Sequence, residues 1–340
     1  MRKKILFITG SMNQTLQMHE IAKHLQDYDC WFSQFFTDSP FYNFLINRTP
    51  LAKNTIFSGQ FKENSEKYLL DNGLRIDYQA KKNKYDMVVY CSDMHIPKRL
   101  RNIKLVWVQE GMTDKFTLLS RIVKTLRLPY FLSGGTSLNG SSNICDIYCA
   151  GSEGYKEQFI KLGTDPAKIV VTGIPNYDNI ARFRDNDFPY KDYVMVATTD
   201  MRETFRMENR PAFIRKAVEI ANGRKLLFKL HPNENFERAE AEIREHAPAG
   251  ALIYRTGNTN HMIANCSELI TQYSTVVYVG MALGKKVHSY FNLEELKRLA
   301  PLQNGGASAA GISGICRNIL NPLTKEVYNA GYYGLEQKSA

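Results

Sequence analysis

The residues of this sequence that are best suited to chemistry stand directly after short apolar runs. The run "LLFKLHPNEN" ends at Lys229, His231 and Pro232, and the run "ELITQYST" ends at Ser274 and Thr275. An imidazole on a turn restricted by proline can donate to a phosphate oxygen, and the lysine adds positive potential. Two hydroxyls at the start of a helix, beside free amide N–H groups, form an anion cradle. Together the two runs predict a phosphate site.

Each feature has an ordinary alternative. A lone His-Pro pair after a strand is often a capping histidine with no ligand. Ser and Thr are preferred at helix N-termini in any case. The phosphate interpretation therefore depends on both runs ending at the same edge of one sheet.

Two further apolar runs end in polar residues. The segment "VVTGIPNYDN" carries Asn176, and "VATTD" carries Thr198 and Thr199. Ligands of open parallel sheets bind beyond the carboxyl ends of the strands. We therefore expect these three residues to contact the same phosphate-bearing ligand as His231.

The elements that position these residues alternate along the whole chain. Short apolar runs predict strands near residues 3–11, 85–93, 103–111, 146–154 and 168–173 in the first half, with helices at 14–28 and 154–163. The second half repeats the pattern, with strands at 193–200, 225–232, 251–256, 268–274 and 285–291 and helices at 210–223, 235–247, 260–266 and 275–284. This alternation predicts an α/β protein with two doubly wound, Rossmann-like domains.

The domain boundary is expected in the polar segment "RDNDFPYKD", residues 184–192. This gives a first domain over residues 1–183 and a second over residues 192–316. Residues 317–340 are expected to form a helical segment that crosses back to the first domain. A chain of 340 residues is long enough for two such domains.

Taken in order, "GIPNYDN", "VMVATTD", "LLFKLHPNEN" and "ELITQYSTVVYVGMALGKKV" resemble nucleotide-sugar glycosyltransferases of the GT-B fold. The patterns are most similar to CDP-glycerol glycerophosphotransferases and to bacterial sialyl-, polysialyl- and Kdo-transferases. The resemblance runs over roughly residues 105 to 290. It implies a GT-B fold in which the first domain, on the acceptor side, and the second domain, which binds the nucleotide donor, face a central cleft. The donor phosphate is then held by His231-Pro232 and Ser274-Thr275.

The resemblance also indicates a catalytic base. The sialyltransferase group has an acidic pair followed by Gly, and "VWVQEGMTD" has Gln109, Glu110 and Gly111 at the comparable place. Glu110 is therefore the candidate base, although Gln replaces the first acidic residue and the glycerophosphotransferases have His-Gly here. The alternative is that Glu110 caps a helix beginning near Met112. Asn176 stands where the glycerophosphotransferases usually have Arg.

The implied activity is inverting transfer from a nucleotide-activated donor, either a CMP-sugar such as sialic acid or Kdo, or CDP-glycerol, in cell-envelope glycan synthesis. We find no Asp-x-Asp pair of the kind that would hold Mg²⁺ against a diphosphate, so no metal and no cofactor are expected.

The first alternative is a UDP-sugar transferase or an enzyme similar to UDP-GlcNAc 2-epimerases, although their Asp-Ser-Gly-Gly signature is missing where this chain has "QYST". The second is a non-catalytic nucleotide-sugar binding protein. Weaker candidates for a nucleoside pocket are Tyr254, Asn260 and His261.

Charge and hydropathy bear on the partners. The net charge of +10 favours anionic partners, but no aromatic-basic pattern of a nucleic-acid module is present. Residues 114–135, Asp114 to Gly135, have apolar side chains at helical spacing between basic ones, which suits a helix in a membrane interface as well as one packed on a core. We expect a cytoplasmic protein, peripheral on the inner face of the membrane, with a glycan or lipid-linked glycan acceptor.

Overall fold

The computed structural model describes residues 2–40, 60–133, 135–203 and 206–322. The chain divides into two compact units, the first formed by residues 1–178 and 306–340 and the second by residues 179–305. Each unit contains one parallel sheet with helices on both faces. The prediction of two Rossmann-like α/β domains is therefore confirmed.

The sheet of the first unit has six parallel strands in the order β2-β1-β3-β4-β5-β6. Its strands are β1 (Lys4–Thr9), β2 (Asp29–Gln34), β3 (Met87–Tyr90), β4 (Lys104–Val108), β5 (Ile147–Ala150) and β6 (Ile169–Val171). Its helices are α1 (Met12–Lys23), α3 (Gln60–Asp71), α4 (Leu118–Thr125), α5 (Glu153–Lys161) and α11 (Ser308–Leu320), with short 3₁₀ turns η2 (Tyr78–Ala80), η3 (Lys98–Leu100), η4 (Tyr130–Ser133) and η5 (Pro166–Lys168).

Alternate residues of the strands build two cores, one on each face of this sheet. Ile5 and Phe7 of β1 face a core that includes helices α1, α3 and α11. On the opposite face, the Trp107 ring of β4 contacts the Phe159 ring of α5 edge to face, with centroids 5.2 Å apart. Because both faces are covered, the strands read as continuous apolar runs, which made most of them visible in the sequence.

The sheet of the second unit has five parallel strands in the order β11-β10-β7-β8-β9. Its strands are β7 (Val194–Ala197), β8 (Leu226–Lys229), β9 (Leu252–Tyr254), β10 (Glu268–Thr271) and β11 (Lys286–His288). Its helices are α6 (Arg210–Ala221), α7 (Phe236–His246), α8 (Thr259–Asn265), α9 (Val276–Ala282) and α10 (Leu293–Leu299), preceded by the 3₁₀ turn η6 (Ile180–Arg184).

Helices α6 and α7 pack on one face of this sheet, over Val194 and Val196 of β7 and Phe228 of β8. Helix α9 lies close to β10. A methyl group added at Gly280 of α9 would stand 2.8 Å from a Leu269 methyl, so only glycine allows this approach. The close packing fixes where α9 begins, and therefore where Ser274 and Thr275 lie.

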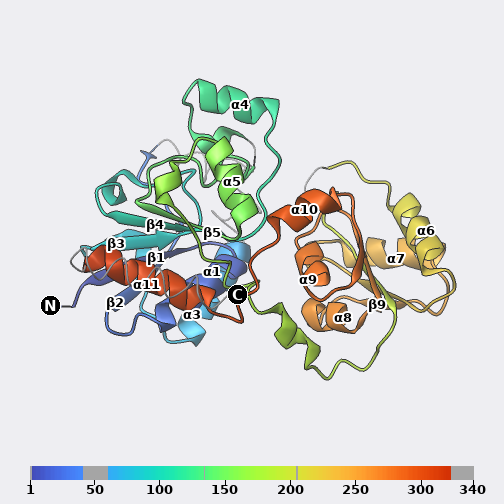
Figure 1. Ribbon diagram of the computed structural model, residues 1–340. Helices are drawn as coiled ribbons and strands as arrows, with labels where there is room; N and C mark the ends of the chain where they lie inside the picture. The colour runs from blue at the N-terminus through green and yellow to red at the C-terminus, as the bar shows by residue number, and fades with distance from the viewer. Residues whose placement is uncertain (1, 41–59, 134, 204–205, 323–340) are drawn as a thin grey trace, which may run out of the picture. The chain divides into compact units, whose positions relative to one another are not determined.

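The units divide at positions that differ from the expected boundaries. Residues 179–183 belong to the second unit because η6 packs on α8 and α9. Residues 306–316 belong to the first unit because α11 packs on α1, as the red helix among the blue elements of Figure 1 shows. The helix that returns to the first unit thus begins at Ser308, before residue 317. Residues 323–340 of the expected terminal segment lie outside the described residues.

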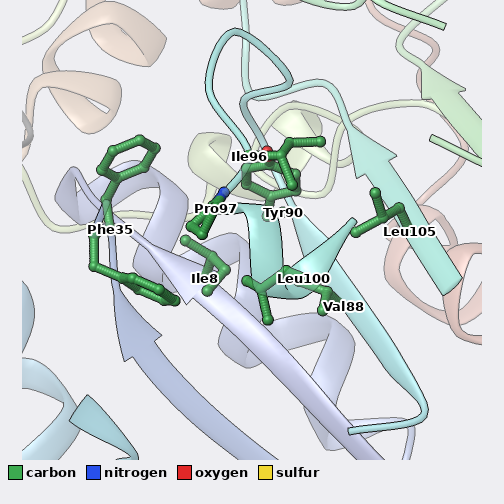
Figure 2. A pocket seen from close by; sticks show the side chains of 9 residues that line it. Ile8, Phe35, Val88, Tyr90, Ile96, Pro97, Leu100 and Leu105 are labelled. Carbon is green, nitrogen blue, oxygen red and sulfur yellow. The ribbon is translucent and has the colours of Figure 1, made fainter. Parts of the chain in front are cut away.

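Below the exposed 3₁₀ turn η3, the first unit encloses a small apolar cavity of about 10 Å³. Figure 2 shows its lining, which includes Ile8, Tyr90, Ile96 and Leu100. The Tyr90 hydroxyl donates to the His95 carbonyl, 3.2 Å away. A space of this size with an apolar lining stays dry, so it is a packing gap and no binding site. Among the described helices, none is long and apolar enough to cross a bilayer.

Candidate functional site

The carboxyl ends of three neighbouring strands meet in the second unit. Ala197 at the end of β7 is paired with Lys229 of β8 on one side and with Thr271 of β10 on the other. His231 stands two residues beyond β8, and Ser274 three residues beyond β10. Strands are about 4.8 Å apart, so β8 and β10 are separated by about 10 Å. The two predicted phosphate-binding runs therefore end at one edge of one sheet, on either side of β7.

The His231-Pro232 turn is built on Thr198. The His231 backbone N–H donates to Thr198 Oγ1 at 3.1 Å and to Glu234 Oε2 at 2.8 Å. The Thr198 hydroxyl in turn donates to Glu234. The Glu234 N–H donates to the His231 carbonyl at 3.1 Å, which closes a β-turn with Pro232 at its second position.

The His231 ring is oriented by the same turn. Its Nδ1 accepts the Asn233 backbone N–H at 3.3 Å and lies 3.6 Å from Asp200 Oδ2. If the ring is neutral and Nδ1 accepts, the proton is on Nε2. If the ring is charged, Nδ1–H faces Asp200 and Nε2 is again protonated. In both states Nε2 is a donor, and the side chain is 33% exposed.

A buried ion pair supports this turn. The Arg210 guanidinium donates to Glu234 at 2.5 Å and to the Thr199 carbonyl at 2.9 Å, and it lies 2.8 Å from Glu208. The side chains of Arg210 and Glu234 are almost completely inaccessible to solvent. A buried charge pair of this kind is costly to break, since removal of one partner leaves the other charge unpaired. The pair holds Thr198, Thr199 and His231 in fixed positions.

Polar contacts continue across the ends of β10 and β11. The Thr199 hydroxyl donates to Gln272 Oε1 at 2.9 Å, and both side chains are buried. The Ser289 hydroxyl donates to the Gln272 carbonyl at 2.7 Å. Thr198 and Thr199 therefore stabilise the strand ends on opposite sides of β7, and their hydroxyls are committed to protein partners.

Ser274 and Thr275 begin helix α9 and are half-buried. Thr275 is the N-cap residue, but its backbone is helical (φ −66°, ψ −15°) and its side chain makes no capping bond. The Ser274 hydroxyl accepts the Val276 N–H in a long contact of 3.4 Å. The ordinary N-cap alternative thus does not describe Thr275, whose hydroxyl can bind a ligand.

Lys229 does not point toward this edge as a free cation. It is buried, and its ammonium donates to the carbonyls of Leu230 at 2.8 Å and Arg255 at 3.1 Å. Burial lowers the pKa of Lys229, partly offset by the Glu234 charge. Lys229 therefore joins the ends of β8 and β9, and we do not retain it as a donor ligand.

The weaker candidates for a nucleoside pocket face the segment before β7. The Tyr254 ring contacts Phe188 with centroids 5.5 Å apart, and the His261 ring lies 6.3 Å from Phe183. The Asn260 backbone N–H donates to Asn258 in the first turn of α8. Asn176 belongs to the first unit, where its side chain donates to the Asn13 carbonyl at 2.9 Å.

Glu110 follows β4 at the carboxyl edge of the first sheet. Its Oε1 accepts the Ser11 hydroxyl at 2.7 Å, and its Oε2 accepts the Gln14 amide at 2.6 Å. Burial raises the pKa of Glu110, and the two hydrogen bonds oppose that rise. A carboxylate that is held by two neutral hydrogen-bond donors and has a raised pKa is suited to accept a proton. No helix begins near Met112, since α4 starts at Leu118 with Thr117 as its cap, so the capping alternative is wrong.

Gln109 is a structural residue. Its amide donates to the Gly111 carbonyl at 2.8 Å and accepts the Gly151 N–H at 2.8 Å. A carboxylate cannot make the first of these bonds, because it has no donor. This explains why Gln fits where the resemblance has an acidic residue, and it fixes the backbone that carries Glu110.

The amphipathic segment at 114–135 is not one helix. Helix α4 covers only Leu118–Thr125, and the chain turns at Arg127 before η4. Only Val123 and Ser120 of α4 are buried. The exposed apolar side chains of the segment are Phe116, Leu118, Leu119, Ile122, Leu126, Leu128 and Leu132, with exposed fractions of 39% to 71%. The alternative in which this apolar face packs on the protein core is therefore wrong.

Sequence reasoning missed Glu234 and Arg210, which hold the site together. Both are charged residues in polar segments, "HPNEN" and "MENRP", that read as solvent-exposed loops. The available signal was weak: Glu234 closes a four-residue turn begun by His231 and Pro232, where a carboxylate can accept backbone N–H groups.

No family model matches the chain, and no curated protein does. Solved structures do share its fold. A UDP-N-acetylglucosamine 2-epimerase is 14% identical, with 96% of this chain and 98% of that chain covered and a TM-score of 0.55. The UDP-GlcNAc 2-epimerase of Neisseria meningitidis bound to UDP-GlcNAc is 11% identical, with 92% and 99% covered and a TM-score of 0.54.

The wall teichoic acid polymerase TagF is also similar. It is 14% identical, 94% of this chain and 88% of that chain are covered, and the TM-score is 0.53. At such identities the likeness concerns the fold, which is of the GT-B type. It extends over nearly the whole chain and so includes both Rossmann-like units.

Proposed function

We propose that this protein is an enzyme that transfers a group from a nucleotide-activated donor to a hydroxyl acceptor. The donor binds to the second unit, with its phosphate between His231 Nε2 and the hydroxyls of Ser274 and Thr275. The observation that carries the proposal is the turn geometry of His231: its Nδ1 accepts the Asn233 N–H, which leaves Nε2 as the hydrogen-bond donor of a partly exposed ring at the sheet edge that Thr275 also borders. Hydrogen-bond donors in these positions stabilise the negative charge on the departing phosphate.

The reaction follows from these roles. Glu110 removes the proton of the acceptor hydroxyl, and the oxygen attacks the anomeric carbon of a sugar donor. A bond from acceptor oxygen to carbon forms as the bond from carbon to the phosphate oxygen breaks, which inverts the configuration. With CDP-glycerol the attacked atom is phosphorus. The nucleotide leaves with its electron pair, and its charge is stabilised by His231 and Thr275. The proposal requires Glu110 to reach the acceptor while the donor is bound.

The donor is proposed to carry a cytidine nucleotide, as CDP-glycerol or a CMP-sugar. Among structures of similar fold, TagF was solved with CDPG, which supports the first of these. A UDP-sugar is the competing donor, because a 2-epimerase of similar fold was solved with UDP-GlcNAc and UDP. The nucleoside contacts lie in loops, and calorimetry with CDP and UDP distinguishes the two nucleobases.

The second candidate is a UDP-GlcNAc 2-epimerase. The proteins of similar fold that bear this name favour it. Against it stands the sequence "QYST" at residues 272–275, where the epimerase signature Asp-Ser-Gly-Gly is expected. In addition, the Gln272 side chain is buried and accepts from Thr199, so it cannot serve as an acid or base.

The acceptor is proposed to be a glycan anchored to a membrane surface. The support is helix α4, whose apolar side chains Leu118, Leu119 and Ile122 are exposed while Lys115 and Arg121 flank them. A short helix with apolar and basic side chains exposed together binds the interface of anionic bilayers.

The proposed function is tested by incubating the protein with CDP-glycerol, CMP-sialic acid, CMP-Kdo and UDP-GlcNAc and analysing the products. Transfer predicts release of CMP from CDP-glycerol or a CMP-sugar, or of UDP from UDP-GlcNAc, together with a modified acceptor. Epimerisation instead converts UDP-GlcNAc to its 2-epimer without an acceptor. If every donor binds but none is consumed with any acceptor, the protein is a binding protein and the proposal fails.

A further inference from the structure

A second cavity in the first unit has the properties of a binding site. It measures about 500 Å³, within the range of ligand pockets. Its lining comes from the segment after β3 and from the segment between α4 and η4, with Lys98, Arg101, Arg127 and Tyr130 among the residues. It is separate from the small apolar cavity of Figure 2, although Ile96 lines both.

The cations of this cavity are not paired with carboxylates. Within the part of the chain that the structure describes, Lys98, Arg101 and Arg127 have no carboxylate oxygen at ion-pair distance. The Arg101 Nε donates to the Ile96 carbonyl at 3.1 Å, which anchors the guanidinium and leaves its terminal nitrogens for a ligand. Arg guanidinium groups bind phosphate oxygens in a bidentate manner.

The two carboxylates of the lining are committed to other donors. Asp93 accepts the backbone N–H groups of Gly140 at 2.7 Å and Ser142 at 2.9 Å, as well as the Tyr148 hydroxyl at 3.2 Å. Asp38 accepts the Arg99 backbone N–H at 3.1 Å. These bonds explain both carboxylates as structural groups, whereas among the described residues no carboxylate forms an ion pair with the three cations.

Arg127 occupies a position where another residue is preferred. Helix α4 ends in a Schellman motif: the Leu128 N–H donates to the Val123 carbonyl at 2.9 Å and the Arg127 N–H to the Lys124 carbonyl at 3.2 Å. Arg127 is the left-handed residue of this motif, with φ 52°. Glycine is strongly favoured there, because a side chain strains the backbone. An arginine at a glycine position indicates that its side chain has a use.

We propose that this cavity binds the phosphate group of a phosphate ester, held by Arg101, Arg127 and Lys98. On the proposed function, on which this assignment rests, the ester belongs to the acceptor, so the acceptor is phosphorylated. A soluble phosphomonoester and the headgroup of an anionic lipid offer the same chemistry. The exposed apolar face of α4, which directly precedes Arg127, would bring a lipid headgroup close to the cavity. The experiment therefore tests the soluble ester and the lipid headgroup separately.

The experiment measures binding of glycerol 3-phosphate and inorganic phosphate by calorimetry to the full-length protein. The variants are Arg127→Gly and Arg101→Ala, and Arg215→Ala is the matched control, since Arg215 is an exposed arginine on α6 of the second unit, outside the cavity lining. Affinity should fall about tenfold or more in the first two and remain unchanged in the control. Arg127→Gly should melt at the same or a higher temperature, because it relieves the left-handed strain, so loss of binding cannot be ascribed to unfolding.

Vesicle co-sedimentation with phosphatidylglycerol separates the two sources. If only vesicle binding depends on Arg127, the site takes a lipid headgroup; if glycerol 3-phosphate binding depends on it, the site takes a soluble ester. The inference is overturned if neither ligand distinguishes Arg127→Gly and Arg101→Ala from wild type.

His231→Ala separates this site from the donor site. Phosphate-ester binding that persists in His231→Ala and is lost in Arg127→Gly supports the cavity even if no nucleotide binds. Nucleotide binding that persists in Arg127→Gly, without phosphate-ester binding to wild type, overturns the cavity and leaves the proposed function intact.

Discussion

The backbone N–H of His231 donates to the Oγ1 of Thr198 at 3.1 Å, across two adjacent strand ends. Thr198 belongs to the end of β7 and His231 to the turn after β8. The imidazole is therefore positioned by the strand that separates it from β10. This contact joins the histidine run to β7, and the hydrogen bond from Thr199 to Gln272 joins β7 to the run that ends in Ser274 and Thr275.

The buried pair between Arg210 and Glu234 should dominate the stability of this edge. Glu234→Gln removes one of the two buried carboxylates that neutralise Arg210, the other being Glu208, and weakens the contacts to Thr198 and His231. The free energy of unfolding should therefore fall by about 2 to 3 kcal/mol. Chemical denaturation of the second unit measures the change. Glu219→Gln on α6 is the control, since its pair with Lys216 is 67% and 68% exposed and should contribute less than about 1 kcal/mol. Equal losses in the two variants would contradict the structural role of Glu234.

The ionisation of Glu110 should respond to Gln14. Burial raises the pKa of Glu110, and the hydrogen bonds from Ser11 and Gln14 favour the charged form and lower it. Gln14→Ala removes one of these bonds, so the pKa should rise further and the carboxylate should be lost at a higher pH on acidification. Titration by carboxyl ¹³C NMR measures it. In an active preparation, the acid limb of kcat/KM should move in the same direction. A downward shift would mean that Gln14 does not stabilise the carboxylate.

Glu110→Gln should separate binding from turnover. The amide keeps the size of the side chain but cannot accept a proton, so turnover should fall by about 100-fold or more while the Kd of the nucleotide is unchanged. The measurement combines steady-state kinetics with calorimetry on the same preparation. Turnover at the wild-type rate would assign the base to another residue.

Helix α4 should anchor the protein to anionic bilayers. Replacing Leu118 and Ile122 with Ser removes exposed apolar area and should reduce co-sedimentation with phosphatidylglycerol vesicles several-fold, because interfacial binding depends on buried apolar surface. Leu70→Ser on α3 is the control, since Leu70 is 61% exposed on another helix of the first unit. If the α4 variant and Leu70→Ser co-sediment with vesicles to the same extent, α4 has no role in membrane binding.

Much of the fold was predictable because most strands are buried on both faces. The strand at 29–34, "DCWFSQ", was missed because it mixes polar and apolar residues without a continuous run. The helix expected over 114–135 was too long because the pattern continues through Arg127, and no sequence rule places an arginine in the left-handed region. The unit boundaries differ from the expected ones because tertiary packing decides to which unit residues 179–183 and 306–316 belong.

The candidate site residues that follow strands could be predicted from the sequence. The side chains that hold them in place could not. His231, Ser274 and Thr275 follow apolar runs, and the parallel sheet brings them to one edge. Lys229 ends the same apolar run as His231, but its ammonium turns inward and donates to two backbone carbonyls. The sequence does not show this orientation, because it depends on tertiary packing. Arg210 and Glu234 are 24 residues apart, and no periodicity connects them.

The most direct test is a double-mutant cycle on nucleotide affinity, measured by calorimetry with CDP and UDP. His231→Ala and Thr275→Val should each weaken binding, the first by about 2 kcal/mol or roughly thirtyfold in Kd, because each removes a hydrogen bond to a charged phosphate. If both residues contact one phosphate, the double variant should deviate from additivity by about 0.5 kcal/mol or more. Nucleotide affinity that is unchanged in both single variants would contradict the account.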